Sequence, residues 1–149
     1  MKIAIGCDEI ALDMKNELKV FMESLGHSVD DFGVYESAPV LYPDVAIKVA
    51  EQVKEGNYEK GVLICGTGIG MAITANKVPG VRAAVCHDPY STQRARMSND
   101  AQIATFGSKV IGLENAKFLL RVFLESDFQG GRSVPKVEKI KEYEKKYFK

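Results

Sequence analysis

The sequence has no excess of charge of either sign and no long apolar run. Its 149 residues include 20 Lys and Arg and 20 Asp and Glu, so the formal net charge is zero. A chain without a basic field is not expected to recruit nucleic acid or an anionic membrane. No apolar stretch approaches the roughly 20 residues of a spanning helix, and the N-terminus lacks the apolar segment and cleavage site of a secretion signal. We therefore expect no nucleic acid and no membrane among the partners, and a cytoplasmic location.

Cysteine is scarce. The three cysteines, Cys7, Cys65 and Cys86, are odd in number and far apart in the chain. This pattern argues against a disulfide framework and against a zinc cluster. We expect free thiols in a reducing compartment and no metal site.

Short β-branched or apolar runs alternate with segments of helical periodicity from end to end. Strands are predicted over 2–6, 27–32, 61–64, 81–85 and 102–106, and helices over 10–25, 43–55, 68–77, 89–97, 113–124 and 134–147. This alternation predicts an α/β protein, with a five-stranded parallel sheet covered on both faces, in a single domain spanning 1–149. Ligands of such sheets bind beyond the carboxyl ends of the strands, so the residues that follow strands are the candidates for chemistry.

The strongest local signal is the turn that follows the third strand, Cys65-Gly66-Thr67-Gly68-Ile69-Gly70. Its glycines let backbone N–H groups converge at a helix N-terminus, which favours an anion site. The spacing matches neither a Walker A loop nor the dinucleotide-binding fingerprint, and a simple tight turn is the alternative. A thiol at this position is expected to have a lowered pKa, which suits nucleophilic attack or proton abstraction. A buried structural cysteine is the competing interpretation.

Other polar residues follow strands or pair at helical spacing. Asp8 and Glu9 follow the first strand, where carboxylates orient hydroxyl groups or cap a helix. His87 follows the fourth strand and is either an acid–base group or incidental. Arg132 and Lys136 are four residues apart, which suits either a phosphate clamp or a solvated basic face.

Several longer motifs occur in an order that is typical of one family. They are Ile5-Gly6-Cys7-Asp8, Tyr42-Pro43-Asp44, Ile64-Cys65-Gly66-Thr67-Gly68-Ile69-Gly70, Ala75-Asn76-Lys77-Val78-Pro79-Gly80-Val81-Arg82-Ala83, Phe106-Gly107-Ser108, Val110-Ile111-Gly112 and Gly130-Gly131-Arg132. On these segments the chain resembles the ribose-5-phosphate isomerase B / galactose-6-phosphate isomerase family along essentially its full length.

The resemblance implies a three-layer α/β/α Rossmann-like fold and the interconversion of an aldose phosphate and a ketose phosphate through a cis-enediolate, without metal or cofactor. It implies a homodimer or tetramer with active sites at the interface, to which the terminal helix 134–147 contributes. The catalytic positions that it implies are Cys65, as the base between C1 and C2, Thr67, His87 and Ser98. The implied substrate-binding positions are Asp8, Glu9, Tyr42, Gly66, Gly68, Ile69, Gly70, Asn99 and Lys109, and the implied phosphate-binding positions are Arg132 and Lys136.

Two departures from the family pattern concern the substrate. Members that act on ribose 5-phosphate usually have Asp-His where this chain has Asp8-Glu9, and His-Asn where it has Ser98-Asn99. The second histidine is assigned to opening the furanose ring, and a serine hydroxyl is a poor general acid near neutral pH. A tetrose 4-phosphate cannot form that ring, because its C4 oxygen carries the phosphate.

The pattern therefore resembles the branch that interconverts erythrose 4-phosphate and erythrulose 4-phosphate. His87 as a replacement acid would instead preserve activity on ribose 5-phosphate. A galactose-6-phosphate-type isomerase built from two different subunits, and a non-catalytic sugar-phosphate-binding subunit, are the remaining alternatives.

Overall fold

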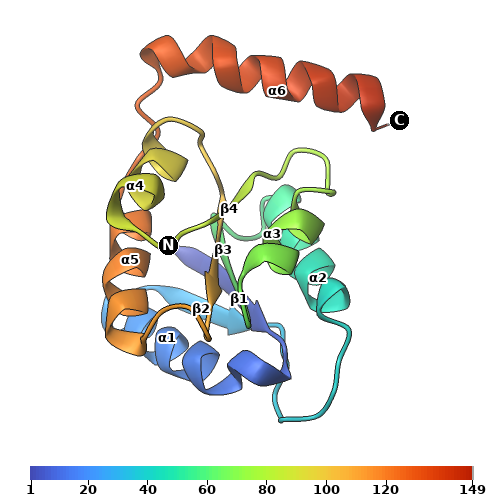
Figure 1. Cartoon of the computed structure of the whole chain (residues 1–149). Coiled ribbons are helices and arrows are strands. Elements are labelled where there is room, and N and C mark those ends of the chain that lie inside the picture. The colour runs from blue at the N-terminus through green and yellow to red at the C-terminus, as the bar shows by residue number, and fades with distance from the viewer. Residues whose placement is uncertain (149) are drawn as a thin grey trace.

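A parallel sheet of five strands forms the centre of the protein in a computed structural model that describes residues 1–148 (Figure 1). The strands are β1 (Lys2–Cys7), β2 (Ser28–Asp31), β3 (Lys60–Cys65), β4 (Ala83–Val85) and β5 (Ile103–Gly107). They lie in the order β2-β1-β3-β5-β4, and every neighbouring pair is parallel. The predicted fold class, a five-stranded parallel sheet in an α/β protein, is confirmed.

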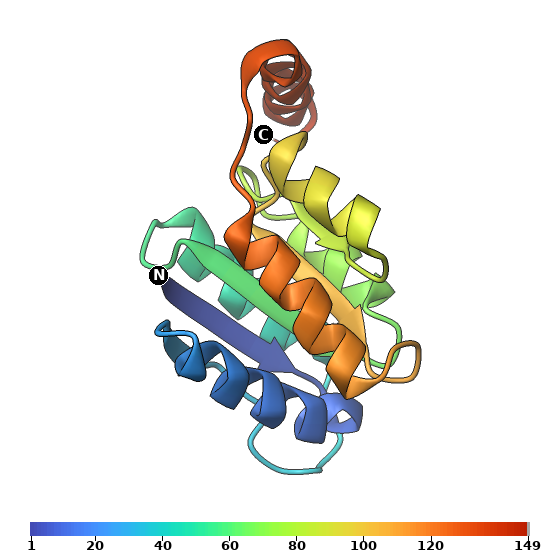
Figure 2. The same cartoon turned by 90° about the vertical axis from the view of Figure 1, so that its left-hand side faces the viewer.

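Helices cover both faces of the sheet (Figures 1 and 2). One face packs against α1 (Leu12–Ser24), α4 (Pro89–Met97) and α5 (Leu113–Glu125), and the other against α2 (Tyr42–Lys54) and α3 (Ile69–Ala75). Side chains alternate along each strand, so Ile64 joins the core under α1 and α5 while Cys65 joins the core under α2 and α3. None of the helices within residues 1–148 combines the length and apolarity of a membrane span.

Two helix starts are set by aspartate side chains. The carboxylate of Asp88 accepts the N–H of Ser91 at 2.7 Å, and α4 begins and ends where the sequence predicts. The helix predicted from residue 10 begins instead as a 3₁₀ turn, η1 (Glu9–Ala11), followed by α1. The turn forms because the buried Asp8 carboxylate accepts two backbone N–H groups of η1, both at 3.1 Å.

The third helix is shorter than predicted. It ends at Ala75, and the Asn76 side chain donates to the Ala83 carbonyl at 2.9 Å, which ties the helix end to the start of β4. Pro79 disfavours a helical conformation at the residue before it, so the chain turns here instead of continuing.

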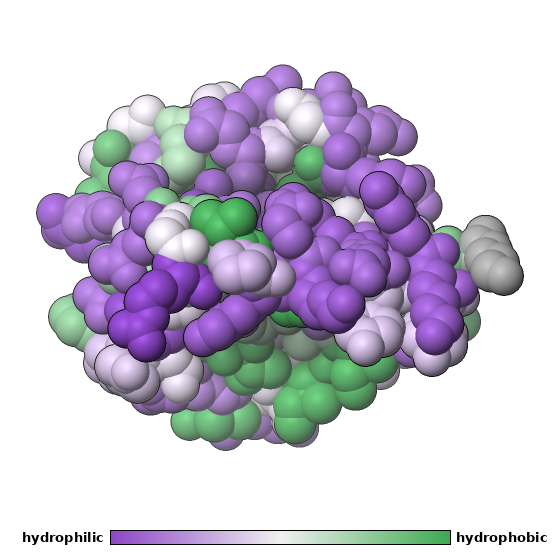
Figure 3. Space-filling view, turned by 90° about the horizontal axis from the view of Figure 1, so that it is seen from above, coloured by the Kyte–Doolittle hydropathy of each residue, from purple (hydrophilic) through white to green (hydrophobic). Residues whose placement is uncertain are grey.

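The C-terminal helix α6 (Val134–Tyr147) lies outside both layers, at the end of the sheet where the strands begin (Figure 1). A 3₁₀ turn, η2 (Gly131–Ser133), leads into it. Val137 is its one buried residue among those described, and the Gly80 N–H donates to the Glu144 carboxylate at 2.8 Å. Seen from this end, hydrophilic side chains cover most of the outer side of α6, and hydrophobic surface lies beside it (Figure 3). The helix is therefore only lightly attached to its own chain.

Candidate active site

The turn between β3 and α3 is folded around the sulfur of Cys65. Cys65 is 5% exposed, and its Sγ accepts the backbone N–H of Gly68 at 3.1 Å. An N–H group directed at sulfur stabilises negative charge there. A second N–H of the turn, that of Ile69, donates to the Thr67 hydroxyl at 3.2 Å. The converging N–H groups predicted from the glycines are present, and two of them have side-chain acceptors within the turn.

Strand β5 fixes the position of this turn. The Thr105 hydroxyl donates to the Gly68 carbonyl at 2.8 Å, and the Ser108 N–H donates to the Cys65 carbonyl at 2.9 Å. Gly68 has a φ of +77°, and a Cβ on it would lie 2.9 Å from the carbonyl carbon of Phe106. Only glycine fits this combination of left-handed backbone and close approach.

Two further predicted residues border the same turn. The Tyr42 hydroxyl at the start of α2 lies directly against Gly70, where any side chain would collide with the phenol. The side chain of Lys109, after β5, passes over Gly66, since a Cβ at Gly66 would lie 3.8 Å from the lysine Cδ. The phenol and the ammonium chain thus border the turn.

The two carboxylates that follow β1 differ in environment. Asp8 is buried and accepts two backbone N–H groups, so helix capping accounts for its position. Burial raises the pKa of Asp8; the N–H of Ala11 opposes the shift and the charge of Glu9 adds to it. Glu9 Oε2 is buried and accepts no hydrogen bond from residues 1–148, and the same holds for the hydroxyl of Ser108 after β5.

His87 is held in one tautomer. The Gly107 N–H donates to its Nε2 at 2.8 Å, so the neutral imidazole carries its proton on Nδ1. Burial lowers the pKa of His87, and the neighbouring Asp88 only partly opposes this. Nδ1 is therefore the one ring atom that can donate a proton to a ligand.

Ser98 and Asn99 lie at the C-terminal end of α4. Arg94 donates through Nε to the Ser98 hydroxyl at 2.8 Å and through its terminal nitrogen to Gln129 at 2.9 Å. The Asn99 carbonyl accepts from Arg82 Nε at 3.0 Å, beside the start of β4. The Ser98 oxygen accepts from the guanidinium, so its own proton is free to be donated elsewhere.

These residues are far from Cys65 within one chain. Arg82 is level with the residue before β5, because Ala83 pairs with Ile103, whereas Cys65 pairs with Gly107 at the end of β5. Five residues of strand at ~3.3 Å each separate the two levels by about 16 Å. Arg132 and Lys136 lie on the Ser98 side: the backbone N–H of Gln129 donates to Met97 at the end of α4 at 3.1 Å, and η2 follows directly.

The structure thus divides the predicted site into two groups. The carboxyl-end group consists of Asp8, Glu9, Tyr42, Cys65, Gly66, Thr67, Gly68, Ile69, Gly70, His87 and Lys109. The amino-end group consists of Ser98, Asn99, Arg132 and Lys136. Arg132 and Lys136 are exposed and form no ion pair with any of residues 1–148.

Sequence reasoning missed two polar residues that border these groups, Arg94 and Ser108. Arg94 is four residues before Ser98 on α4, a spacing at which helical side chains meet, so the signal was present. Ser108 follows a strand, but nothing in the sequence indicates that its hydroxyl is buried and unpaired.

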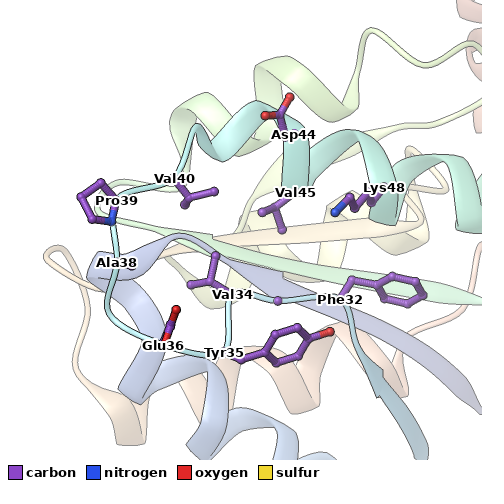
Figure 4. Close-up of a pocket in the computed structure, with 11 residues that line it drawn as sticks. Phe32, Val34, Tyr35, Glu36, Ala38, Pro39, Val40, Asp44, Val45 and Lys48 are labelled. Carbon is purple, nitrogen blue, oxygen red and sulfur yellow. The ribbon is translucent and has the colours of Figure 1, made fainter.

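A cavity of about 480 Å³ lies elsewhere, between the segment after β2 and helix α2. Val34, Val40 and Val45 point toward one another across it (Figure 4). It contains none of the predicted site residues and gives no support for a ligand site at Cys65. Among residues 1–148 no cluster of three or more His, Cys, Asp or Glu side chains could hold a metal ion.

Comparison with known proteins gives one consistent result. The family model described as Ribose/Galactose Isomerase matches residues 3–140. A ribose-5-P isomerase B of Listeria innocua is 53% identical over 146 residues, covering 98% of this chain and 99% of its own. A D-erythrulose-4-phosphate isomerase of Pectobacterium atrosepticum is 49% identical over 145 residues, covering 97% and 95%. The solved structure of Clostridium thermocellum ribose-5-phosphate isomerase B superposes with a TM-score of 0.97 at 47% identity over 99% of both chains.

Proposed function

The chain belongs to the ribose/galactose isomerase family, and we propose that it moves a proton between C1 and C2 of a sugar phosphate at Cys65. It is a sugar-phosphate isomerase of the ribose-5-phosphate isomerase B type, an aldose–ketose isomerase like its relatives. The observation that carries the assignment to Cys65 is the Gly68 N–H on its sulfur, inside a turn whose other N–H groups face the same edge of the sheet.

The proposed reaction proceeds through a cis-enediolate. The Cys65 thiolate removes the C2 proton of the aldose, and the C1 oxygen takes up negative charge as the C1–C2 double bond forms. The backbone N–H groups of the turn Gly66–Gly70, with the Thr67 hydroxyl, hold this oxygen charge. The same proton then returns from sulfur to C1, the C2 hydroxyl loses its proton to the C1 oxygen side, and the ketose results.

The assignment predicts a clear separation of binding from turnover. Cys65→Ala removes the base, so kcat should fall by about 10²–10⁴ while the affinity for a non-reacting polyol phosphate stays within about threefold of wild type. The matched control is Cys86→Ala, which removes a fully buried thiol from the opposite helix layer. Retention of full kcat by Cys65→Ala would contradict the proposal.

We propose further that the amino-end group reaches Cys65 from a second copy of the chain. The separation of about 16 Å along β5 is longer than a four- or five-carbon sugar phosphate can bridge while reacting at one end. Helix α6 supports this arrangement: it stands off its own chain and exposes Ile140 by 44% and Tyr143 by 52%. A homodimer would cover these side chains and bring Arg132 to the phosphate.

Complementation tests the shared site. Cys65→Ala and Arg132→Ala chains, unfolded together and refolded as a mixture, should form mixed dimers in half of all cases. Each mixed dimer holds one intact site of two, so about a quarter of wild-type activity should return. Activity no higher than the sum of the two separate variants would mean that each site is built from one chain.

The preferred substrate is proposed to be a tetrose phosphate. Ser98 carries no group able to open a furanose ring near neutral pH, and its oxygen is already an acceptor for Arg94. The 49% identity to a D-erythrulose-4-phosphate isomerase supports this choice. The test is the ratio of kcat/KM for erythrose 4-phosphate and ribose 5-phosphate, and a higher value for ribose 5-phosphate would exclude the tetrose preference.

Two other functions make different predictions in the same assay. A galactose-6-phosphate-type enzyme made of two different subunits predicts no turnover by this chain alone. A non-catalytic binding subunit predicts no exchange of the C1 or C2 proton with D₂O for any sugar phosphate, although the sugar phosphate binds.

A further inference from the structure

Two buried, unpaired polar atoms lie on either side of the Cys65 strand. In the sheet, β3 has β1 on one side and β5 on the other. Glu9 follows β1 and Ser108 follows β5, and Cys65 ends the strand between them. Glu9 Oε2 and Ser108 Oγ are both shielded from solvent, and neither has a hydrogen-bond partner among residues 1–148.

Such atoms are costly, because a polar group removed from water without a new partner loses its hydration. Neighbouring polar groups are satisfied: the Asp8 carboxylate accepts two N–H groups, and the Ser108 N–H is bound to the Cys65 carbonyl at 2.9 Å. The unpaired atoms are therefore not a general feature of this edge, and they are available to a ligand that supplies the missing hydrogen bonds.

The chemistry of the pair limits what that ligand group can be. An ionised carboxylate only accepts hydrogen bonds, so it needs a donor, and a sugar hydroxyl is one. A phosphate group offers oxygen acceptors and negative charge, which Glu9 and the nearby Asp8 carboxylate repel. Lys109 is the cation on this edge, beside Ser108 in a cavity of about 370 Å³.

We propose that Glu9 and Ser108 bind a sugar hydroxyl beyond the reacting C1–C2 pair, and thereby fix the direction in which the substrate lies. This inference rests on the proposed function. The hydroxyl-bearing carbon sits over the carboxyl-end group, and the phosphate points away from Glu9 toward Arg132 and Lys136 of the amino-end group. Glu9, where ribose 5-phosphate isomerases usually have histidine, becomes a determinant of substrate choice.

The test uses three non-reacting probes in calorimetric titrations: erythritol 4-phosphate, its 3-deoxy analogue and inorganic phosphate. Glu9→Gln and Ser108→Ala should each weaken binding of erythritol 4-phosphate about tenfold. Binding of the 3-deoxy analogue and of inorganic phosphate should change less than about twofold. Glu23→Gln is the control, since it removes the same charge from an exposed position at the far end of α1.

The unfolding midpoint of the ligand-free variants is a second measurement. Removal of an unpaired buried atom should leave the midpoint unchanged or raise it, whereas a structural role for either side chain predicts a lower midpoint. A drop in midpoint therefore contradicts the inference.

Three binding results would overturn it. Tighter binding of inorganic phosphate to Glu9→Gln would place the phosphate next to Glu9. Equal losses for erythritol 4-phosphate and its 3-deoxy analogue would exclude a hydroxyl contact, as would unchanged affinities. If wild-type protein turns over sugar phosphates while the variants bind normally, this inference alone fails; if wild-type protein neither binds nor turns over any of them, the proposed function fails as well.

Discussion

Gly68→Ala measures how closely the Cys65 turn approaches strand β5. Gly68 has a φ of +77°, and an added Cβ would lie 2.9 Å from the carbonyl carbon of Phe106. The left-handed backbone costs an L-residue about 1–2 kcal/mol. Contact with backbone, which cannot swing aside, adds about 1–3 kcal/mol. We expect the free energy of unfolding to fall by about 2–5 kcal/mol.

Two other glycines separate these contributions. Gly26 has a φ of +94° with no atom within 4 Å of an added Cβ, so Gly26→Ala should show only the backbone cost of about 1–2 kcal/mol. Gly112 has a φ of −78° and equally open space, so Gly112→Ala should stay within about 1 kcal/mol of wild type. Urea denaturation of the three variants under one set of conditions gives the comparison.

The same variant tests the chemistry. A shifted turn moves the Gly68 N–H away from the Cys65 sulfur, and loss of one such donor typically costs about 10²–10³ in kcat. The close-approach argument is refuted if Gly68→Ala is no less stable than Gly26→Ala. The role of the turn is refuted if folded Gly68→Ala retains wild-type kcat.

Three more predictions concern other parts of the molecule. Lys15, 1% exposed and 2.6 Å from the Asp31 carboxylate, should lower the unfolding free energy by about 3 kcal/mol in a urea titration when changed to Met, because it leaves Asp31 without its partner. Burial lowers the pKa of His87 below 6.5, so below that pH the unfolded chain binds a proton that the folded chain does not; stability should fall from pH 7 to pH 5, and His87→Gln should reduce the slope. Ser98→His should raise kcat/KM on ribose 5-phosphate relative to erythrose 4-phosphate at least about tenfold, and an unchanged ratio contradicts the ring-opening explanation.

The elements that local signals define could be predicted from the sequence. Helix α4 is an example: Asp88 followed by Pro89 fixes its start, and both act within a few residues of chain. The Cys65 turn is another, because the glycines that allow it are consecutive in the motif. The 3₁₀ turn after β1 was missed, since the choice of Asp8 to cap two successive N–H groups depends on its burial.

The division of the site into two groups illustrates a longer-range limit. Ser98 and Cys65 were assigned to one site by resemblance, and spacing along the chain does not say which end of the sheet each occupies. The topology does: a helix that connects parallel strands returns the chain to the amino end, so the end of α4 must lie away from Cys65. The unpaired state of Ser108 could not be predicted, because it depends on every side chain that surrounds it.

The contrast among the three cysteines has a practical consequence. Cys7 and Cys86 have no exposed surface, and burial raises the pKa of Cys7 to about 11 and that of Cys86 to about 12, so both remain protonated thiols at physiological pH. Cys65 keeps a small exposed area and an N–H donor on its sulfur. An electrophile added to the folded protein should therefore form a single adduct per chain. The mass of that adduct counts correctly folded turns, which makes alkylation a direct measure of the competent fraction in any preparation.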